Sequence, residues 1–297
     1  MSRYLAPLIA CLLGCDAWAV SVTDFAGRTV ELDRPAQRIV ALAPHIVENV
    51  YSAGAGDKLV GVVSYSDYPP AARSIPRIGT YNAFSLEKLV ALGPDLVVMW
   101  GSGNGGGTLS RLVNLDIPVY VSELRDLADI PASIRRLGTL AGTSEVSEAE
   151  AGRLERELEE LQQTYGAGPP LKVFYQIWHE PLQTVNGEHL ISQVLALCGG
   201  RNLFAGARSL APRISVESVL VGNPDAIVAG GMGEAKPDWL EDWRRYPSLS
   251  AVSGDALLYV NPDLIQRPTA RVLTGARRLC RQFQTLRESR GEGKARP

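Results

Sequence analysis

Short apolar runs alternate with amphipathic segments along most of the chain. In the first half, runs of strand length lie at 38–42, 59–63, 96–100 and 117–121. In the second half, similar runs lie at 171–177, 226–228 and 257–260. Because strands that alternate with helices form a mostly parallel sheet, we predict an α/β fold of two lobes, each with a mostly parallel sheet flanked by helices.

The prediction of two lobes rests on a repeat. Residues 85–98 and 215–228 follow one pattern, 130 residues apart. In each copy a serine begins a short helix as its N-cap, and a glutamate in the first turn favours the helix dipole. A Pro-Asp pair ends the helix before an apolar strand. Two copies of one unit imply related lobes with a cleft between them, and the equivalent glutamates, Glu87 and Glu217, place one exposed carboxylate on each lobe.

A single long helix is predicted to join the lobes. An apolar stripe recurs every three to five residues from 144 to 165, among glutamates and arginines, and glycines and prolines follow it. A coiled-coil helix is the alternative, but the stripe is short for one. The predicted organisation is an N-terminal lobe at 20–143, a rigid connecting helix at 144–168, a C-terminal lobe at 169–286 and a charged, disordered tail at 287–297.

Residues 1–19 have the pattern of an export signal peptide. A basic residue precedes an apolar stretch at 5–14, and an Ala-x-Ala cleavage site ends at Ala19. The stretch is shorter than the ~20 residues that a membrane-spanning helix needs. Leu12–Cys15 also resembles a lipobox. The pattern therefore allows two mature forms: a soluble periplasmic chain cleaved near Ala19, or a chain that is lipid-anchored at Cys15.

Outside that signal the chain has one pair of cysteines, Cys198 and Cys280. In the oxidising compartment to which the signal leads, two such cysteines are expected to form a disulfide. The bond would close a loop of about 80 residues and contribute ~4 kcal/mol through loop entropy. Two buried free thiols are the alternative.

Composition and charge narrow the function further. The chain is 45% hydrophobic with a net charge of −2, which is typical of a globular protein and lacks the basic surface of a nucleic-acid binder. His45 and His179 each follow a predicted strand, so both could face the cleft and ligate a metal centre. Because two histidines without a carboxylate cluster make a poor metal site, we predict no metal.

Four aromatic residues lie at positions suited to a binding cleft. Trp100 and Trp178 end predicted strands, Tyr65 follows one, and Tyr81 lies in the loop before the first repeat copy. Parallel strands point their carboxyl ends toward such a cleft. We therefore predict that these aromatic rings clamp a broad, flat, partly apolar ring system.

Four segments carry a resemblance to a known family. They are Ser64–Pro70 (Ser-Tyr-Ser-Asp-Tyr-Pro-Pro), Leu92–Trp100, Cys198–Gly200 and Asp263–Arg267. Together they resemble the periplasmic substrate-binding proteins of ABC importers whose lobes are joined by one rigid helix (class III), and within that class the cobalamin-binding family. The resemblance covers nearly the whole chain after the signal.

The resemblance implies a monomeric, non-enzymatic periplasmic protein that captures a corrinoid in the cleft and delivers it to a membrane permease. The corrinoid is the transported ligand, and no resident cofactor is implied. In the family, positions that match Asp263 and Arg267 contact the ligand, where arginine donates to the amide fringe of the corrin and aspartate accepts from it. Positions that match Glu87 and Glu217 dock onto arginines of the permease.

The sequence departs from the family pattern at two positions. Ala211 and Tyr81 stand where cobalamin binders usually carry tryptophan. Haem or a ferric siderophore is the alternative ligand, although a siderophore needs several basic groups and only Arg213 and Arg267 are candidates. An enzyme on a nitrogenase-like scaffold would need cysteine ligands for a cluster, and an interaction protein built on the acidic helix would have no pocket.

Overall fold

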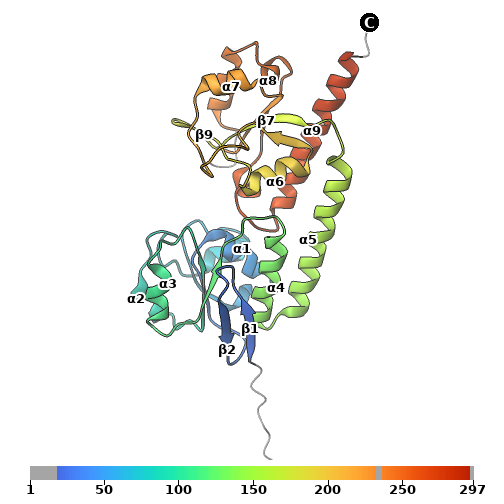
Figure 1. The fold of residues 1–297 in the computed structure, drawn as a ribbon. Helices are drawn as coiled ribbons and strands as arrows, with labels where there is room; N and C mark the ends of the chain where they lie inside the picture. The colour runs from blue at the N-terminus through green and yellow to red at the C-terminus, as the bar shows by residue number, and fades with distance from the viewer. Residues whose placement is uncertain (1–18, 232–235, 295–297) are drawn as a thin grey trace, which may run out of the picture.

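The described residues, 19–231 and 236–294 of a computed structural model, form two lobes that are joined along one flank by a long helix (Figure 1). This helix, α5 (Ser144–Tyr165), lies where the connector was expected. It packs on α4 (Asp129–Ala141) of the N-terminal lobe and on α9 (Val272–Lys294) of the C-terminal lobe. Within the described ranges, no helix has both the length and the apolarity to cross a membrane.

The N-terminal lobe is built on a four-stranded parallel sheet in the order β4-β3-β5-β6. Its strands are β3 (Ile39–Ala41), β4 (Leu59–Val62), β5 (Leu96–Trp100) and β6 (Val119–Ser122), and a hairpin of β1 (Val20–Thr23) and β2 (Thr29–Leu32) precedes them. Its helices, besides α4, are α1 (Pro44–Ser52), η1 (Gly56–Lys58), η2 (Pro70–Ser74), α2 (Leu86–Ala91) and α3 (Thr108–Val113). Buried side chains of α1 and α4 cover one face, and those of α2 and α3 cover the other. Burial on both faces explains why the strands are continuous apolar runs.

The C-terminal lobe repeats this plan with the parallel order β10-β7-β11-β12. Its strands are β7 (Leu171–Gln176), β10 (Gly200–Asn202), β11 (Ala226–Ala229) and β12 (Leu257–Tyr259), with a small hairpin of β8 (Trp178–His179) and β9 (Leu182–Gln183). Its helices, besides α9, are α6 (Leu190–Leu197), α7 (Val216–Gly222), η3 (Asp238–Arg245), α8 (Ser250–Ser253) and η4 (Pro262–Leu264). Helices α6 and α9 cover one face, and α7, α8 and η3 cover the other.

The sequence repeat corresponds to two equivalent structural units. Ser85 begins α2 and Ser215 begins α7, and each hydroxyl accepts a hydrogen bond from the backbone N–H three residues later, at 3.1 and 3.3 Å. The repeated aspartates, Asp95 and Asp225, each accept backbone N–H groups at the start of a neighbouring strand, β3 or β7. Capping and strand anchoring therefore explain why serine and aspartate keep the same register in both lobes.

The predicted disulfide is confirmed. Cys198, at the end of α6, is bonded to Cys280 of α9 with an S–S distance of 2.02 Å, and both residues are fully buried. They belong to a cluster of buried side chains that continues through Leu154 and Leu161 of α5 into the N-terminal lobe. The apolar core is thus continuous across the connector, as expected for a rigid joint.

The prediction of a disordered tail from residue 287 is wrong as far as Lys294, because α9 continues to that residue. The guanidinium of Arg287 donates to the carbonyl oxygens of Cys198 and Gly199, both at 2.8 Å, and Arg290 pairs with Asp225. These contacts fix residues 287–290 of the helix to the lobe. Residues 295–297 lie outside the described residues. Residues 1–18 of the predicted signal, which include Cys15 but not Ala19, lie outside them as well.

Candidate ligand site between the lobes

Two of the predicted ligand residues, Tyr81 and Trp100, lie together at the carboxyl end of the N-terminal sheet. Trp100 is the last residue of β5, and its ring centroid is 5.7 Å from that of Tyr81. Asn104 ties the two segments together, since its side chain donates to the Tyr81 carbonyl at 2.6 Å and accepts from the Trp100 backbone N–H at 2.5 Å. The sequence prediction missed Asn104, whose one local signal is its place in a run of glycines.

His45 extends this aromatic pair toward the other lobe. Its buried imidazole lies in the first turn of α1 and meets the Trp100 ring edge-to-face, with centroids 5.2 Å apart. Arg267 of the C-terminal lobe lies close enough for its charge to act on this imidazole. His45 therefore lies beside Trp100, within reach of the charge of Arg267, whereas His179 is on the surface of the C-terminal lobe. Among the described residues, no group of three or more His, Cys, Asp or Glu side chains could hold a metal ion.

Asp263 and Arg267 lie in contact at the other side of this site. One nitrogen of the Arg267 guanidinium is 3.0 Å from an Asp263 carboxylate oxygen, and another donates to Glu48 of α1, also at 3.0 Å. Glu48 was missed by the sequence prediction, although its place three residues after His45 puts both on one face of α1. Trp100 thus meets α1 at His45, and Arg267 meets α1 from the other lobe at Glu48. We call the four predicted residues on these two sides of α1, Tyr81, Trp100, Asp263 and Arg267, the interlobe cluster.

The other two predicted ligand residues are Tyr65 and Trp178. Among the described residues, neither has a hydrogen bond, ion pair or ring contact to that cluster. Tyr65 is 69% exposed, and its backbone has a φ of 65°, a left-handed conformation that is rare for a bulky residue and is often found at binding sites. Trp178 lies beside His179, which stacks on Trp239 at 5.5 Å. Trp239 belongs to η3, and the sequence prediction did not include it.

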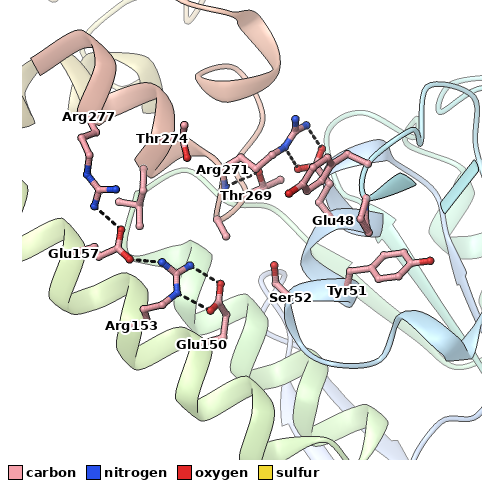
Figure 2. A pocket seen from close by; sticks show the side chains of 14 residues that line it. Glu48, Tyr51, Ser52, Glu150, Arg153, Glu157, Thr269, Arg271, Thr274 and Arg277 are labelled. Atoms are coloured by element: carbon pink, nitrogen blue, oxygen red, sulfur yellow. Dashed lines mark hydrogen bonds and ion pairs between the residues drawn. The ribbon is translucent and has the colours of Figure 1, made fainter. Parts of the chain in front are cut away.

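A cavity of about 490 Å³ lies between α1, α5 and the start of α9 (Figure 2). Its charged side chains are paired: Arg153 with Glu150 and Glu157, and Arg277 with Glu157. Arg271 borders the cavity as well and pairs with Glu48. None of the six predicted ligand residues lines this cavity. A lining of paired charges does not suit a flat, partly apolar ring, so we place the candidate ligand site at the interlobe cluster.

Comparison with known proteins assigns this fold to a family. A family model described as periplasmic binding protein matches residues 39–263. The chain belongs to the periplasmic binding protein family. This binding protein is 34% identical over 256 residues to the vitamin B12-binding protein of Vibrio campbellii, with 86% of the chain and 92% of that relative covered.

Solved structures support the same assignment. The crystal structure of the periplasmic vitamin B12 binding protein BtuF of Vibrio cholerae matches this binding protein with a TM-score of 0.78 and 34% identity, over 85% of the chain and 98% of that structure. The periplasmic heme-binding protein RhuT of Roseiflexus has a TM-score of 0.71 at 21% identity, over 84% of the chain and 99% of that structure, which shows a shared fold alone. Because the match to the Vibrio cholerae structure covers most of the chain, the two-lobed α/β architecture predicted from the repeat is confirmed.

The environment of His45 predicts a pH dependence of stability in this binding protein. Burial, followed by the charge of Arg267, lowers the pKa of His45 from 6.5 to about 3. Between these values only the unfolded chain takes up a proton, so the contribution of His45 is complete above pH 6.5 and is lost as the pH falls toward 3. We expect the stability difference between wild type and His45→Gln, measured by urea unfolding, to change by about 2 kcal/mol from pH 7 to pH 5 in favour of the variant. An unchanged difference would contradict a neutral, buried imidazole.

Proposed function

We propose that this periplasmic binding protein captures cobalamin between its lobes and delivers it to the permease of an ABC importer. The observation that carries the proposal is the similarity, over both lobes, to proteins named as vitamin B12-binding, at 34% identity and with a TM-score of 0.78 for the Vibrio cholerae structure. The proposed role involves no catalytic step, and cobalamin is the transported ligand rather than a cofactor.

The chemistry of the interlobe cluster supports a corrinoid as the ligand. The aromatic pair Tyr81 and Trp100 offers apolar area for the flat macrocycle. Arg267 and Asp263 offer a donor and an acceptor for its peripheral amides, and the Asp263 side chain is half-exposed. We include the exposed ring of Tyr65 and the indole of Trp178 as further contacts, made when the ligand is bound.

The proposal is tested by native mass spectrometry of the chain from Val20 onward after incubation with equimolar cyanocobalamin and haemin. The expected spectrum shows one cobalamin per chain and no haemin. Selective retention of haemin would overturn the proposal in favour of a haem-transport role.

We propose further that Glu87 and Glu217 are the contacts to the permease. Both carboxylates are exposed in the first turns of α2 and α7, which are capped in the same way by serine. Hydrogen bonds from its own backbone N–H and from Ser215 lower the pKa of Glu217, so this carboxylate stays ionised in the periplasm. A matched pair of anionic groups on two lobes suits a partner with two cationic sites.

Charge reversal tests this docking surface. We expect Glu87→Lys with Glu217→Lys to weaken binding to the cognate permease in nanodiscs by about tenfold or more, since each attraction becomes a repulsion. Cobalamin affinity should stay unchanged, because neither residue belongs to the interlobe cluster. Glu145→Lys, which alters another exposed first-turn glutamate, is the control. Equal permease binding by the double variant and the control would contradict the assignment.

A further inference from the structure

The two lobes are joined by an ion-pair network in addition to α5. Glu48 of α1 is 3% exposed, and one of its carboxylate oxygens accepts hydrogen bonds from Arg267 at 3.0 Å and from Arg271 at 2.6 Å. The other oxygen accepts from Nε of Arg271 at 2.8 Å. A single buried carboxylate of the N-terminal lobe therefore neutralises two arginines of the C-terminal lobe, and Figure 2 shows its pair with Arg271.

Two further contacts hold the same segment of the C-terminal lobe. The guanidinium carbon of Arg271 lies 4.1 Å from the centroid of the Tyr68 ring, a cation–π contact to the loop after β4. The side-chain amide of Asn49, next to Glu48, donates to the Pro268 carbonyl at 3.0 Å. Residues 267–271 are thus bound to two separate elements of the N-terminal lobe.

We propose that Glu48 and Arg271 form an interlobe clasp that fixes the spacing of the lobes and holds Arg267 in position for the ligand. Arg267 forms ion pairs with two carboxylates, Glu48 of the other lobe and Asp263 four residues before it. The clasp residues themselves are positioning residues without ligand contact. The statement about Arg267 rests on the proposed function, whereas the statement about lobe spacing does not.

The physical basis of the clasp is the charge balance around Glu48. Without Arg271, the carboxylate keeps one of its two cationic partners and loses its bidentate contact. Without Glu48, two guanidinium groups would face each other in a poorly hydrated space and separate. Arg271 borders the cavity of about 490 Å³ between α1, α5 and the start of α9, so its side chain has room to move once a partner is lost.

The lobe spacing is tested by pulsed electron paramagnetic resonance on the ligand-free chain from Val20 onward. Nitroxides at Val113→Cys in α3 and Val221→Cys in α7 report the distance between the lobes, and both positions are exposed. The native cysteines are held in the disulfide and do not react. We expect Arg271→Gln to broaden the distance distribution and Arg271→Lys to broaden it less. The control is Arg277→Gln, which removes an arginine that lines the same cavity but pairs with Glu157.

The positioning of Arg267 is tested by cyanocobalamin titration of the same variants. We expect Arg271→Gln to weaken binding by about tenfold, since the pre-set geometry of the site is lost, and Arg277→Gln to change it by less than about twofold. An unchanged distance distribution in Arg271→Gln would overturn the clasp. A broadened distribution with unchanged cobalamin affinity would overturn the role in positioning Arg267. Failure of the wild type to bind cobalamin would contradict the proposed function but not the proposed lobe spacing, because the distance measurement needs no ligand. If Arg271→Gln does not fold, Arg271→Lys decides both points.

Discussion

Replacing both Cys198 and Cys280 with alanine is expected to lower the free energy of unfolding by about 4 kcal/mol. The bond spans 82 residues and ties the end of α6 to α9, so its loss frees a long loop in the unfolded chain. This amount is a large fraction of the total stability of an ordinary domain. Urea unfolding at pH 7, compared with that of the wild type, measures the difference.

The reduced wild type provides the control for this prediction. Wild-type chain in excess dithiothreitol has the same covalent connectivity as the double alanine variant and should unfold at a similar urea concentration. Loss of less than about 1 kcal/mol in the double variant would contradict the prediction and would show that the bond restricts the unfolded chain little.

Replacing Trp100 with alanine is expected to weaken cobalamin binding by about 2 kcal/mol or more, which is about 30-fold. Trp100 is the centre of the cluster, with Tyr81 on one side and His45 on the other, so its removal takes away both direct contact area and the support for two neighbours. Fluorescence or calorimetric titration with cyanocobalamin gives the ratio of dissociation constants.

Two variants separate this effect from general damage. Trp100→Phe keeps an aromatic face and should bind within a few-fold of the wild type. Tyr51→Ala removes an aromatic ring that borders the cavity beside α5, outside the predicted ligand site, and should leave the affinity unchanged. Wild-type affinity in Trp100→Ala would remove Trp100 from the site, and equal losses in Trp100→Ala and Tyr51→Ala would point to a global effect.

The parts of the fold that the sequence predicted well are those set by local chemistry. The serine N-caps at Ser85 and Ser215 depend on neighbours within a few residues, as do the buried apolar strands. The repeat could therefore be recognised from the sequence. The disulfide followed from the number of cysteines and the export signal. The tail was predicted wrongly because the bonds that hold Arg287 run to Cys198 and Gly199, 89 and 88 residues away.

Only part of the candidate site could be predicted, because its other residues also depend on contacts between distant parts of the chain. Strand ends identified Trp100, but its link to Tyr81 runs through Asn104, which bonds the end of β5 to a loop 23 residues earlier in the chain. Glu48 and Arg271 are 223 residues apart and meet only when the two lobes come together. A charge that is satisfied across lobes has no local pattern, so these two residues could be found only in the structure.

Binding of a corrinoid between the lobes can be measured by calorimetric titration of the chain from Val20 onward with cyanocobalamin, and in parallel with haemin. We expect tight binding of one cobalamin per chain, weakened by Arg267→Ala, and no heat with haemin. No heat with cobalamin together with stoichiometric binding of haemin would contradict it.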